Sequence, residues 1–291
     1  MSPGAFNYDD AVSANRGLIS SEEQRTLRGS TVAIPGLGGV GGAHLLTLTR
    51  LGVGRFAIAD GDTFELRNFN RQVGATMHTI GASKTAVMAD LAKAINPELA
   101  ISTFPEIDAR NVDEFLRGCH VVIDGLDFFR IDARRLLFRR ARELGIPVIT
   151  CGPLGFGVAL LVFMPDGPSF DDFLDLRDSM DEREQLLRFA VALAPAALHL
   201  PYVDFHYVNL AERRGPSSSI AINLCAAVAA TEALAVLLKR RQPLAVPRYA
   251  QFDPYRLRFR TGVLRGGNRH PWQRVKLWYL KRRLRHELNG R

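Results

Sequence analysis

Cysteine is scarce in this sequence. The chain has three cysteines among 291 residues, and no two of them form a Cys-x-x-Cys pair. Cys119, Cys151 and Cys225 lie far apart in the chain, which argues against a disulfide framework and against a zinc site built from cysteine pairs. We therefore expect no structural zinc, and we expect a reducing, cytoplasmic environment.

Uninterrupted apolar runs of membrane-spanning length are also missing. The longest candidate, Ala221–Leu238, is interrupted by Asn223 and Glu232, whereas a spanning helix needs about 20 predominantly apolar residues. The N-terminal stretch carries Asp9 and Asp10 and does not have the charge pattern of a signal peptide. We expect neither a membrane span nor a secretory signal.

Most of the chain has no excess of basic residues. The formal net charge is +8, from 38 basic and 30 acidic residues. Nine of the basic residues and one of the acidic residues lie in 265–291, so residues 1–264 contain 29 of each sign. Because the body is neutral, nucleic acid is not an expected partner of the protein as a whole.

The basic residues of 265–291 accompany a helical repeat of leucines. This region therefore predicts a basic amphipathic helix that contacts a partner, an anionic membrane surface or its own domain. The leucines that share one face are Leu277, Leu280, Leu284 and Leu288.

The most informative stretch is Val32–Gly42, a short apolar run that leads into a cluster of glycines. An apolar helical segment follows at 43–51, and a second apolar run at 55–59 ends on Asp60. The order of strand, glycine turn, helix, strand and acid is typical of the first βαβ unit of a nucleotide-binding fold. The glycines by themselves do not distinguish ATP from a redox dinucleotide.

Each glycine of this turn has a separate expected task. Gly36 permits the tight turn, Gly38 and the adjoining Gly39 let backbone approach a phosphate, and Gly41 lets the helix lie close to the strand. The helix N-terminus offers free N–H groups and a positive dipole to an anion. Asp60 can accept hydrogen bonds from ribose hydroxyls.

The remaining segments predict an α/β fold with a Rossmann-like, mainly parallel sheet and helices on both faces. We expect a long insertion crossing the sheet at 165–216, an apolar helix from Ser218 to Leu238 packed on all sides, and antiparallel C-terminal strands. The expected organisation is an N-terminal arm at 1–30, a nucleotide-binding α/β domain at 31–264 and the basic tail at 265–291.

The glycine turn is the first of several short motifs that follow one another along the chain. Together they resemble the ThiF/MoeB/HesA superfamily, the bacterial relatives of ubiquitin-activating enzymes. The resemblance covers about residues 16–238. The motifs are Gly36–Gly42, Asp60-Gly61-Asp62, Asn68-Phe69-Asn70-Arg71-Gln72, Gly81-Ala82-Ser83-Lys84 and Asp124-Gly125-Leu126-Asp127.

The resemblance implies an ATP- and Mg²⁺-dependent adenylyltransferase. It would activate the C-terminal carboxylate of a small ubiquitin-like or sulfur-carrier protein, or of a peptide, as an acyl adenylate with release of pyrophosphate. By the same resemblance Arg71 and Lys84 would hold the phosphates, and Asp127 would bind Mg²⁺. Lys84 also begins a predicted helix, where the dipole disfavours a cation, so we expect an anion beside it.

Further roles come from the resemblance alone. Asp60 would bind the ribose, Asn68 would position the phosphates and Gln72 would contribute to the nucleotide site. Arg16 would reach the ATP of the partner subunit in a homodimer.

Some departures and alternatives stay open. Phe128 stands where the family usually has asparagine, and Asp124 could take the metal instead of Asp127. The crossing segment 165–216 contains no cysteine, so Cys151 is the one candidate for a thioester, and a buried, unreactive thiol is the competing interpretation. The alternative functions are an NAD(P)-dependent oxidoreductase and a non-catalytic ThiF-like scaffold that binds a peptide.

Overall fold

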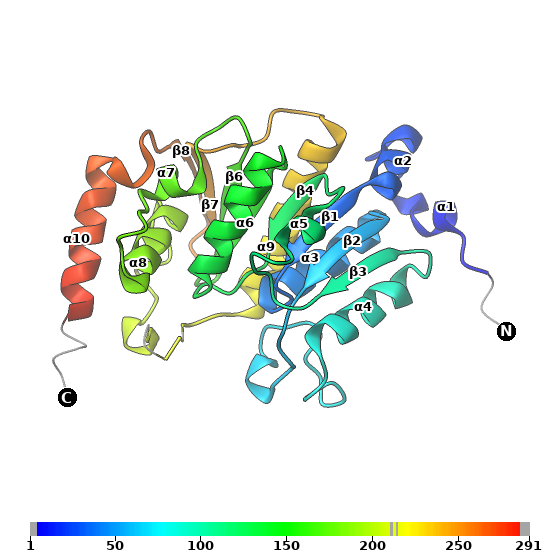
Figure 1. Ribbon diagram of the computed structural model, residues 1–291, viewed down its shortest axis with the longest axis horizontal. Coiled ribbons are helices and arrows are strands. Elements are labelled where there is room, and N and C mark those ends of the chain that lie inside the picture. Colours follow the sequence, from blue (N-terminus) through cyan, green and yellow to red (C-terminus); the bar gives the residue numbers. More distant parts are fainter. Residues whose placement is uncertain (1–4, 210–211, 214, 286–291) are drawn as a thin grey trace.

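The fold is a three-layer α/β sandwich around one mixed sheet (Figure 1). The computed structural model describes residues 5–209, 212–213 and 215–285. The eight strands lie in the order β3-β2-β1-β4-β5-β6-β7-β8. Their bounds are β1 Thr31–Pro35, β2 Arg55–Ala59, β3 Ala100–Phe104, β4 Val121–Asp124, β5 Val148–Leu154, β6 Gly157–Phe163, β7 Arg248–Asp253 and β8 Arg258–Val263.

Strands β1 to β5 pair in parallel, and β5 to β8 pair antiparallel. The expected α/β class, with a mainly parallel half and antiparallel C-terminal strands, is therefore confirmed. The helices are α1 Tyr8–Ala11, α2 Ser21–Gly29, α3 Gly39–Leu51, α4 Lys84–Ile95, α5 Val112–Leu116, α6 Ile131–Glu143, α7 Phe170–Leu174, α8 Glu182–Leu193, α9 Ser219–Leu238 and α10 Pro271–Arg285.

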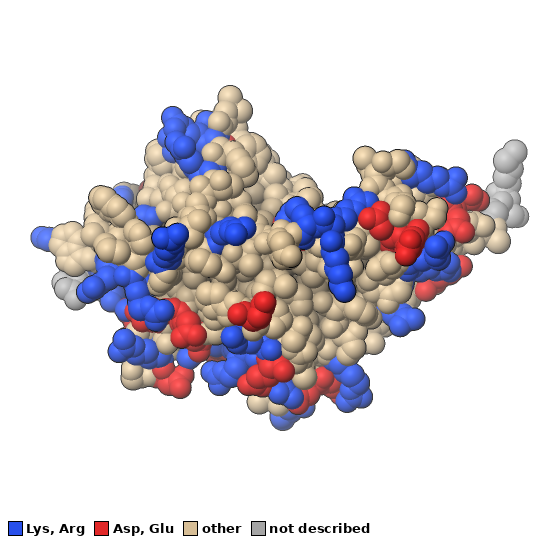
Figure 2. Space-filling model, turned by 90° about the horizontal axis from the view of Figure 1, so that it is seen from above, with Lys and Arg blue, Asp and Glu red and all other residues tan. Residues whose placement is uncertain are grey.

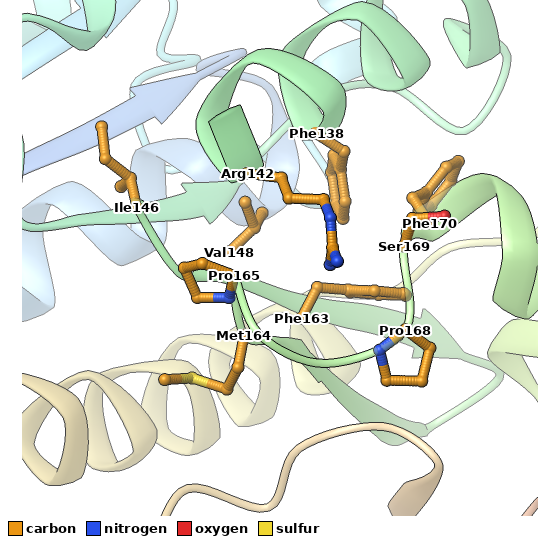
Figure 3. Close-up of a pocket in the computed structure, with 10 residues that line it drawn as sticks. All are labelled: Phe138, Arg142, Ile146, Val148, Phe163, Met164, Pro165, Pro168, Ser169 and Phe170. Carbon is orange, nitrogen blue, oxygen red and sulfur yellow. The ribbon is translucent and has the colours of Figure 1, made fainter. Parts of the chain in front are cut away.

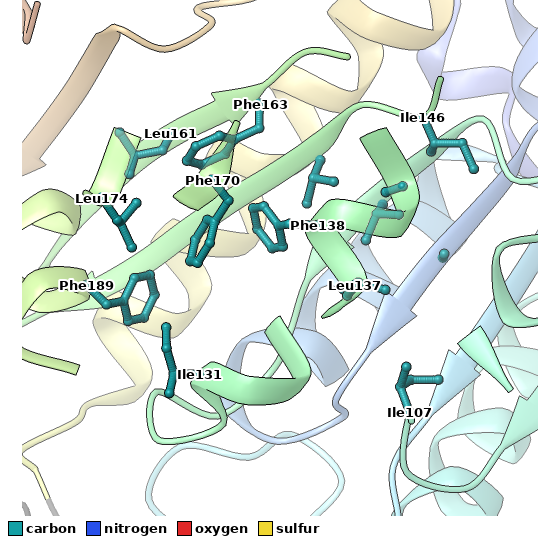
Figure 4. Packing of buried hydrophobic residues seen from close by; sticks show 14 of the residues in the cluster. Ile107, Ile131, Leu137, Phe138, Ile146, Leu161, Phe163, Phe170, Leu174 and Phe189 are labelled. Carbon is teal, nitrogen blue, oxygen red and sulfur yellow. The ribbon is translucent and has the colours of Figure 1, made fainter. Parts of the chain in front are cut away.

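Successive residues of each strand point to opposite faces of the sheet, so the strands contribute to two hydrophobic cores, one on each face. On one face Val122 and Leu161 pack with α5 to α8, and this core contains the group of aromatic rings drawn in Figure 4. On the other face Ile34 and Ile123 pack with α3, α4 and α9. Burial on both faces explains why the parallel strands are apolar throughout.

Helix α9 is long and apolar enough to cross a membrane by length and composition. Here it packs against the sheet through residues such as Cys225 and Ala229, which are fully buried. The expectation that α9 is packed on all sides is wrong, because Asn223, Ala227 and Thr231 form an exposed stripe. A helix on the outer layer of a three-layer fold has one side in solvent, however apolar its composition.

Helix α3 contains a buried histidine. His44 has no exposed surface, and neither ring nitrogen has a hydrogen-bond partner. Because burial disfavours the imidazolium, the pKa of His44 is lowered to about 3.

This buried imidazole predicts sensitivity to acid. The unfolded chain binds the proton near pH 6.5 and the folded chain near pH 3, so stability falls as the pH falls through this interval. We expect the free energy of unfolding to drop by about 2 kcal/mol between pH 7 and pH 5 from this group. Urea unfolding of the wild type and of His44→Leu at both pH values measures the difference. An equal pH dependence in the two proteins would contradict the prediction.

Candidate functional site

The site lies where the strand order reverses. In the sheet, β1 stands between β2 and β4, so the chain leaves β1 and β4 toward opposite faces and a crevice opens at their carboxyl ends. The glycine turn follows β1, and the Asp124–Asp127 turn follows β4. In an open α/β sheet this is the edge at which ligands bind.

The two turns are interlocked by glycines. Gly36 has a φ of +83°, and a Cβ there would lie 2.3 Å from the Gly125 carbonyl oxygen. A Cβ on Gly41 would lie 1.8 Å from the Gly36 carbonyl oxygen. These two glycines are therefore needed for backbone contact between the turns and α3, as the sequence predicted for the turn and for close packing.

Gly38 and Gly39 face the loop that contains Arg71. A Cβ on Gly38 would have the Gln72 amide as its nearest neighbour, at 3.7 Å. A Cβ on Gly39 would meet Ile222 of α9 at 2.8 Å and Arg71 Cγ at 3.8 Å. The glycine loop, the Asn68–Gln72 loop and the first turns of α9 are thus direct neighbours.

Gln72 is a buried polar group without a partner at this place. Only 7% of the residue is exposed, and its Oε1 accepts no hydrogen bond. A buried polar atom without a partner carries a free-energy cost, which a ligand donor would remove. The structure brings Gln72 to the glycine loop, as expected for a nucleotide site.

Asp60 supports the glycine turn. Its Oδ2 accepts a 2.7 Å hydrogen bond from the Leu37 N–H, and its Oδ1 accepts one from the Asp62 N–H at 2.9 Å. The side chain is only 9% exposed. This anchoring role was not foreseen from the sequence, which suggested ribose binding alone.

Lys84 has the anionic neighbour that its helix-start position predicted. The residue is buried, and its Nζ lies 2.8 Å from Asp62 Oδ2 and 4.0 Å from Asp60 Oδ1. Asp62 is 76% exposed, so its carboxylate can exchange for another anion at little desolvation cost. Sequence reasoning gave Asp62 no task, although its position two residues after Asp60 was visible.

Arg71 has no acidic partner among the described residues. Its Nη1 donates to the Arg67 carbonyl oxygen and to Asn70 Oδ1, both at 3.0 Å and both neutral. Asn70 in turn donates to the Ser217 carbonyl oxygen just before α9. Arg71 therefore carries an uncompensated positive charge beside the glycine loop.

Asn68 is buried and shapes this loop. Its Oδ1 accepts a 2.9 Å hydrogen bond from the Glu65 N–H in a capping box around residues 66–68. It positions the Arg71 backbone, because the Arg71 N–H donates to the Asn68 carbonyl oxygen. The structure supports Asn68 as a positioning residue.

The two aspartates of the β4 turn have different surroundings. Asp124 is buried and pairs with Arg134, with Nε and Oδ2 2.8 Å apart, and it also accepts from the Thr150 hydroxyl. Asp127 is exposed, and only its Oδ1 is engaged, by the Phe129 N–H. Asp127 therefore has a carboxylate oxygen available to a cation, whereas Asp124 does not.

Arg134 holds the turn in place, a function that sequence reasoning missed. Besides Asp124, its guanidinium donates to the carbonyl oxygens of Leu126 at 2.7 Å and Asp127 at 3.2 Å. An arginine one turn into the helix after a strand-end aspartate was the available signal. Phe128 stacks on Phe189 of α8, with ring centroids 5.3 Å apart, and the Arg134 guanidinium lies over the same Phe189 ring, 4.5 Å from its centroid.

The described part of the chain does not form a complete metal site by itself. No group of three or more His, Cys, Asp or Glu side chains in the described residues could hold a metal ion. Mg²⁺ is commonly held by one or two carboxylates together with water and substrate phosphates. A single available carboxylate on Asp127, next to the glycine turn, fits that mode.

One predicted residue, Arg16, lies away from the reacting edge. Arg16 follows Asn15, whose Nδ2 donates to the Leu51 carbonyl oxygen at the far end of α3. The glycine loop lies at the opposite end of α3 from this contact. Because α3 spans 13 residues and rises about 1.5 Å per residue, the loop is about 20 Å from the Leu51 end, beside which Arg16 lies. The structure thus does not bring Arg16 to the site of its own chain.

Cys151 is 2% exposed, and burial raises its thiol pKa well above the usual range. Such a thiol carries little thiolate and is a poor nucleophile.

A small cavity of about 10 Å³ lies between α6 and the β6–α7 connection, lined in part by Phe138 and Arg142 (Figure 3). It is near the start of β5, away from the glycine turn.

The geometry defines an α/β protein with a Rossmann-like fold, and the sequence pattern of the ThiF family matches residues 12–272. The chain belongs to the ThiF family, so the expected enzyme class is confirmed at the level of the family.

Curated relatives match only part of the chain. A tRNA threonylcarbamoyladenosine dehydratase of Haemophilus influenzae is 32% identical over 151 residues, 51% of this chain and 57% of that protein. The sulfur carrier protein ThiS adenylyltransferase of Escherichia coli is 30% identical over 148 residues, 50% of this chain and 58% of that protein. The chain thus spans little more than half the length of these relatives.

Solved structures share the fold over most of the chain. PaaA superposes with a TM-score of 0.67 at 22% identity, covering 90% of this chain and 85% of its own. E. coli MccB with ATP gives a TM-score of 0.60 at 17% identity, covering 84% and 66%. At these identities the likeness supports the fold.

Proposed function

We propose that the protein uses ATP to adenylate a carboxylate. The observation that carries the proposal is the charge arrangement at the strand edge: uncompensated Arg71 beside the glycine loop, and the available Asp127 carboxylate on the adjoining turn. A redox dinucleotide site has no use for this pair, and the family match favours ATP over the NAD(P)-dependent alternative.

In the proposed reaction a substrate carboxylate oxygen attacks the α-phosphorus of ATP. The bond from that phosphorus to the bridging oxygen of the β-phosphate breaks, and pyrophosphate leaves with the electron pair. Both reactants are anionic, so catalysis requires fixed positive charge at the phosphate oxygens. Arg71 supplies such a charge, and Lys84 supplies a second when a phosphate takes the place of the exposed Asp62 carboxylate.

The other residues hold the nucleotide in position. Asp60 keeps the Leu37 N–H and the glycine turn in place, and Gln72 offers its unpaired oxygen to the nucleotide. Asp127 would hold Mg²⁺, which when bound neutralises phosphate charge. Because Cys151 is buried, no thioester on this chain is part of the proposal.

The proposed carboxylate is the C-terminus of a small ubiquitin-like or sulfur-carrier protein, or of a peptide. The name of the E. coli ThiS adenylyltransferase supports this class. A carboxylate carried on tRNA is the second candidate, because several relatives are named tRNA threonylcarbamoyladenosine dehydratases. The neutral body of the chain favours the first candidate.

Exchange of labelled pyrophosphate into ATP tests the function. Exchange that depends on Mg²⁺ and on a sulfur-carrier protein or peptide with a free C-terminus supports the proposal, and the same peptide with an amidated C-terminus is the control. Dependence on tRNA would support the second candidate. Nucleotide binding without exchange for any carboxylate would favour the non-catalytic scaffold.

We further propose that Arg16 acts in a homodimer, since it lies too far from its own glycine loop. Neither Arg16→Ala nor Asp127→Ala should be active alone. Mixed subunits should recover part of the exchange activity, because half of the sites in the heterodimers, about a quarter of all sites in a statistical mixture, would have both residues intact. Mixtures as inactive as the parent variants would contradict the shared site.

A further inference from the structure

Helix α10 lies almost entirely beyond the region that matches the family. That region ends at residue 272, whereas α10 spans Pro271–Arg285. Figure 1 shows α10 at one end of the molecule, beside α8 and far from the N-terminal helices. The family match therefore says little about what this helix does.

The inner face of α10 is firmly docked on the crossing segment. Leu277 is buried against Leu187 and Val191 of α8, and Leu280 packs beside them. Gln273 Nε2 donates to the Val191 carbonyl oxygen at 2.9 Å, and Lys281 pairs with Glu184 at 2.6 Å. These contacts confirm that the predicted leucine face is buried on its own domain. The Leu284 side chain and all of Leu288 lie outside the described part of the chain.

The outer face of α10 is aromatic and uncovered. Trp272, Val275, Trp278 and Tyr279 are 71%, 53%, 59% and 54% exposed. At 3.6 residues per turn these four side chains lie on one stripe opposite the docked leucines. An exposed stripe of two tryptophans, a tyrosine and a valine marks an interaction surface.

The charged residues of α10 itself all have the same sign. Residues 271–285 contain six Lys or Arg and no acid. Arg282 lies over the Trp278 ring, 5.5 Å from its centroid, and Arg274 and Arg283 flank the stripe. In Figure 2 the end of the molecule formed by α10 carries blue side chains around a tan surface. The complementary partner is anionic and has an apolar layer.

We propose that α10 docks the protein on an anionic membrane surface, with the aromatic stripe at the headgroup level. Tryptophan and tyrosine prefer this interface, and arginine stems lie along apolar surface while their guanidinium groups contact lipid phosphates. A second copy of the chain does not suit this face, because isologous pairing would oppose two basic surfaces. Nucleic acid is a weaker match, because the stripe has no amide side chain to read bases, its Tyr279 hydroxyl already accepts a hydrogen bond from Arg283, and Arg282 covers one Trp278 face.

The chain has only two tryptophans, and both lie on this stripe. Tryptophan fluorescence, excited at a wavelength that tyrosine does not absorb, therefore reports α10 alone. With the full chain, vesicles of phosphatidylcholine containing 30 mol% phosphatidylglycerol, about the anionic density that attracts basic segments, should shift the emission to the blue and protect it from acrylamide. Pure phosphatidylcholine vesicles should do neither.

Charge removal on α10 should weaken binding specifically. Arg282→Gln with Arg283→Gln should lower the partition coefficient about thirtyfold, because each basic residue near such a surface contributes about 1 kcal/mol. The matched control, Lys93→Gln with Arg117→Gln, removes two exposed charges elsewhere and should bind like the wild type. Co-sedimentation of Trp272→Ala with Trp278→Ala should show a similar loss.

Three results would overturn the proposal. The first is the absence of a fluorescence change with anionic vesicles, or an equal loss in the control variant. The second is an equal or larger change with single-stranded RNA at the same phosphate concentration, which would assign the face to nucleic acid. The third is a blue shift on raising the protein concentration without lipid, which would assign it to a second copy of this chain.

Discussion

Asp127→Ala is expected to reduce ATP–pyrophosphate exchange at least a hundredfold. The substitution removes the available carboxylate at the β4 turn, and loss of one preorganised electrostatic contact to a reacting phosphate costs about 10²–10³ in rate. Because Asp127 is exposed and its side chain accepts only the Phe129 N–H, the fold should survive. The urea unfolding midpoint should stay within experimental error of the wild type.

The neighbouring Asp132 is the matched control for this experiment. It is 80% exposed, and its partner Arg130 lies 3.8 Å away at the start of α6. Asp132→Ala should retain wild-type exchange and the wild-type dependence on Mg²⁺ concentration. Equal activity of Asp127→Ala and Asp132→Ala would exclude Asp127 from the metal and phosphate site.

Arg134→Met is expected to be the most destabilising of these substitutions. It leaves the Asp124 carboxylate buried without its ion-pair partner, because the two side chains are only 3% and 1% exposed. Breaking a buried pair in this way costs about 3–5 kcal/mol. Equilibrium unfolding in urea measures the loss as a lower midpoint with an unchanged slope.

The double variant Asp124→Leu with Arg134→Met tests whether the lost stability comes from the unpaired buried charge or from lost packing. Replacing both charges with apolar side chains removes the uncompensated carboxylate, so most of the lost stability should return. Exchange activity should not return, since Arg134 also donates to the Leu126 and Asp127 carbonyl oxygens. A double variant no more stable than Arg134→Met would show that the buried charge is not the cause.

Local rules predicted the elements of this site well. Ser20 caps α2 with a complete capping box to Glu23, three positions later in the chain. Gly36 takes the positive φ that the turn requires, and Ser83 caps α4 immediately before Lys84. Each of these features depends on residues within a few positions of one another.

Contacts between distant residues could not be predicted in the same way. Phe128 looked like a defect in a polar site, but it belongs to an aromatic stack with Phe189, 61 positions later in the chain. Asn70 meets Ser217 only because the crossing segment returns to the glycine loop before α9. The sequence contains both partners but not the fold path that brings them together.

The sequence by itself determined the α/β class, the glycine turn and the family, since these depend on short-range periodicity and on motifs a few residues long. The tertiary structure decided which charges are available. It neutralises Asp124 with Arg134, gives Lys84 an exchangeable partner in Asp62, and leaves Arg71 and Asp127 uncompensated. The physical reason is that electrostatic availability depends on burial and on neighbours across the fold, and both are set when the layers pack.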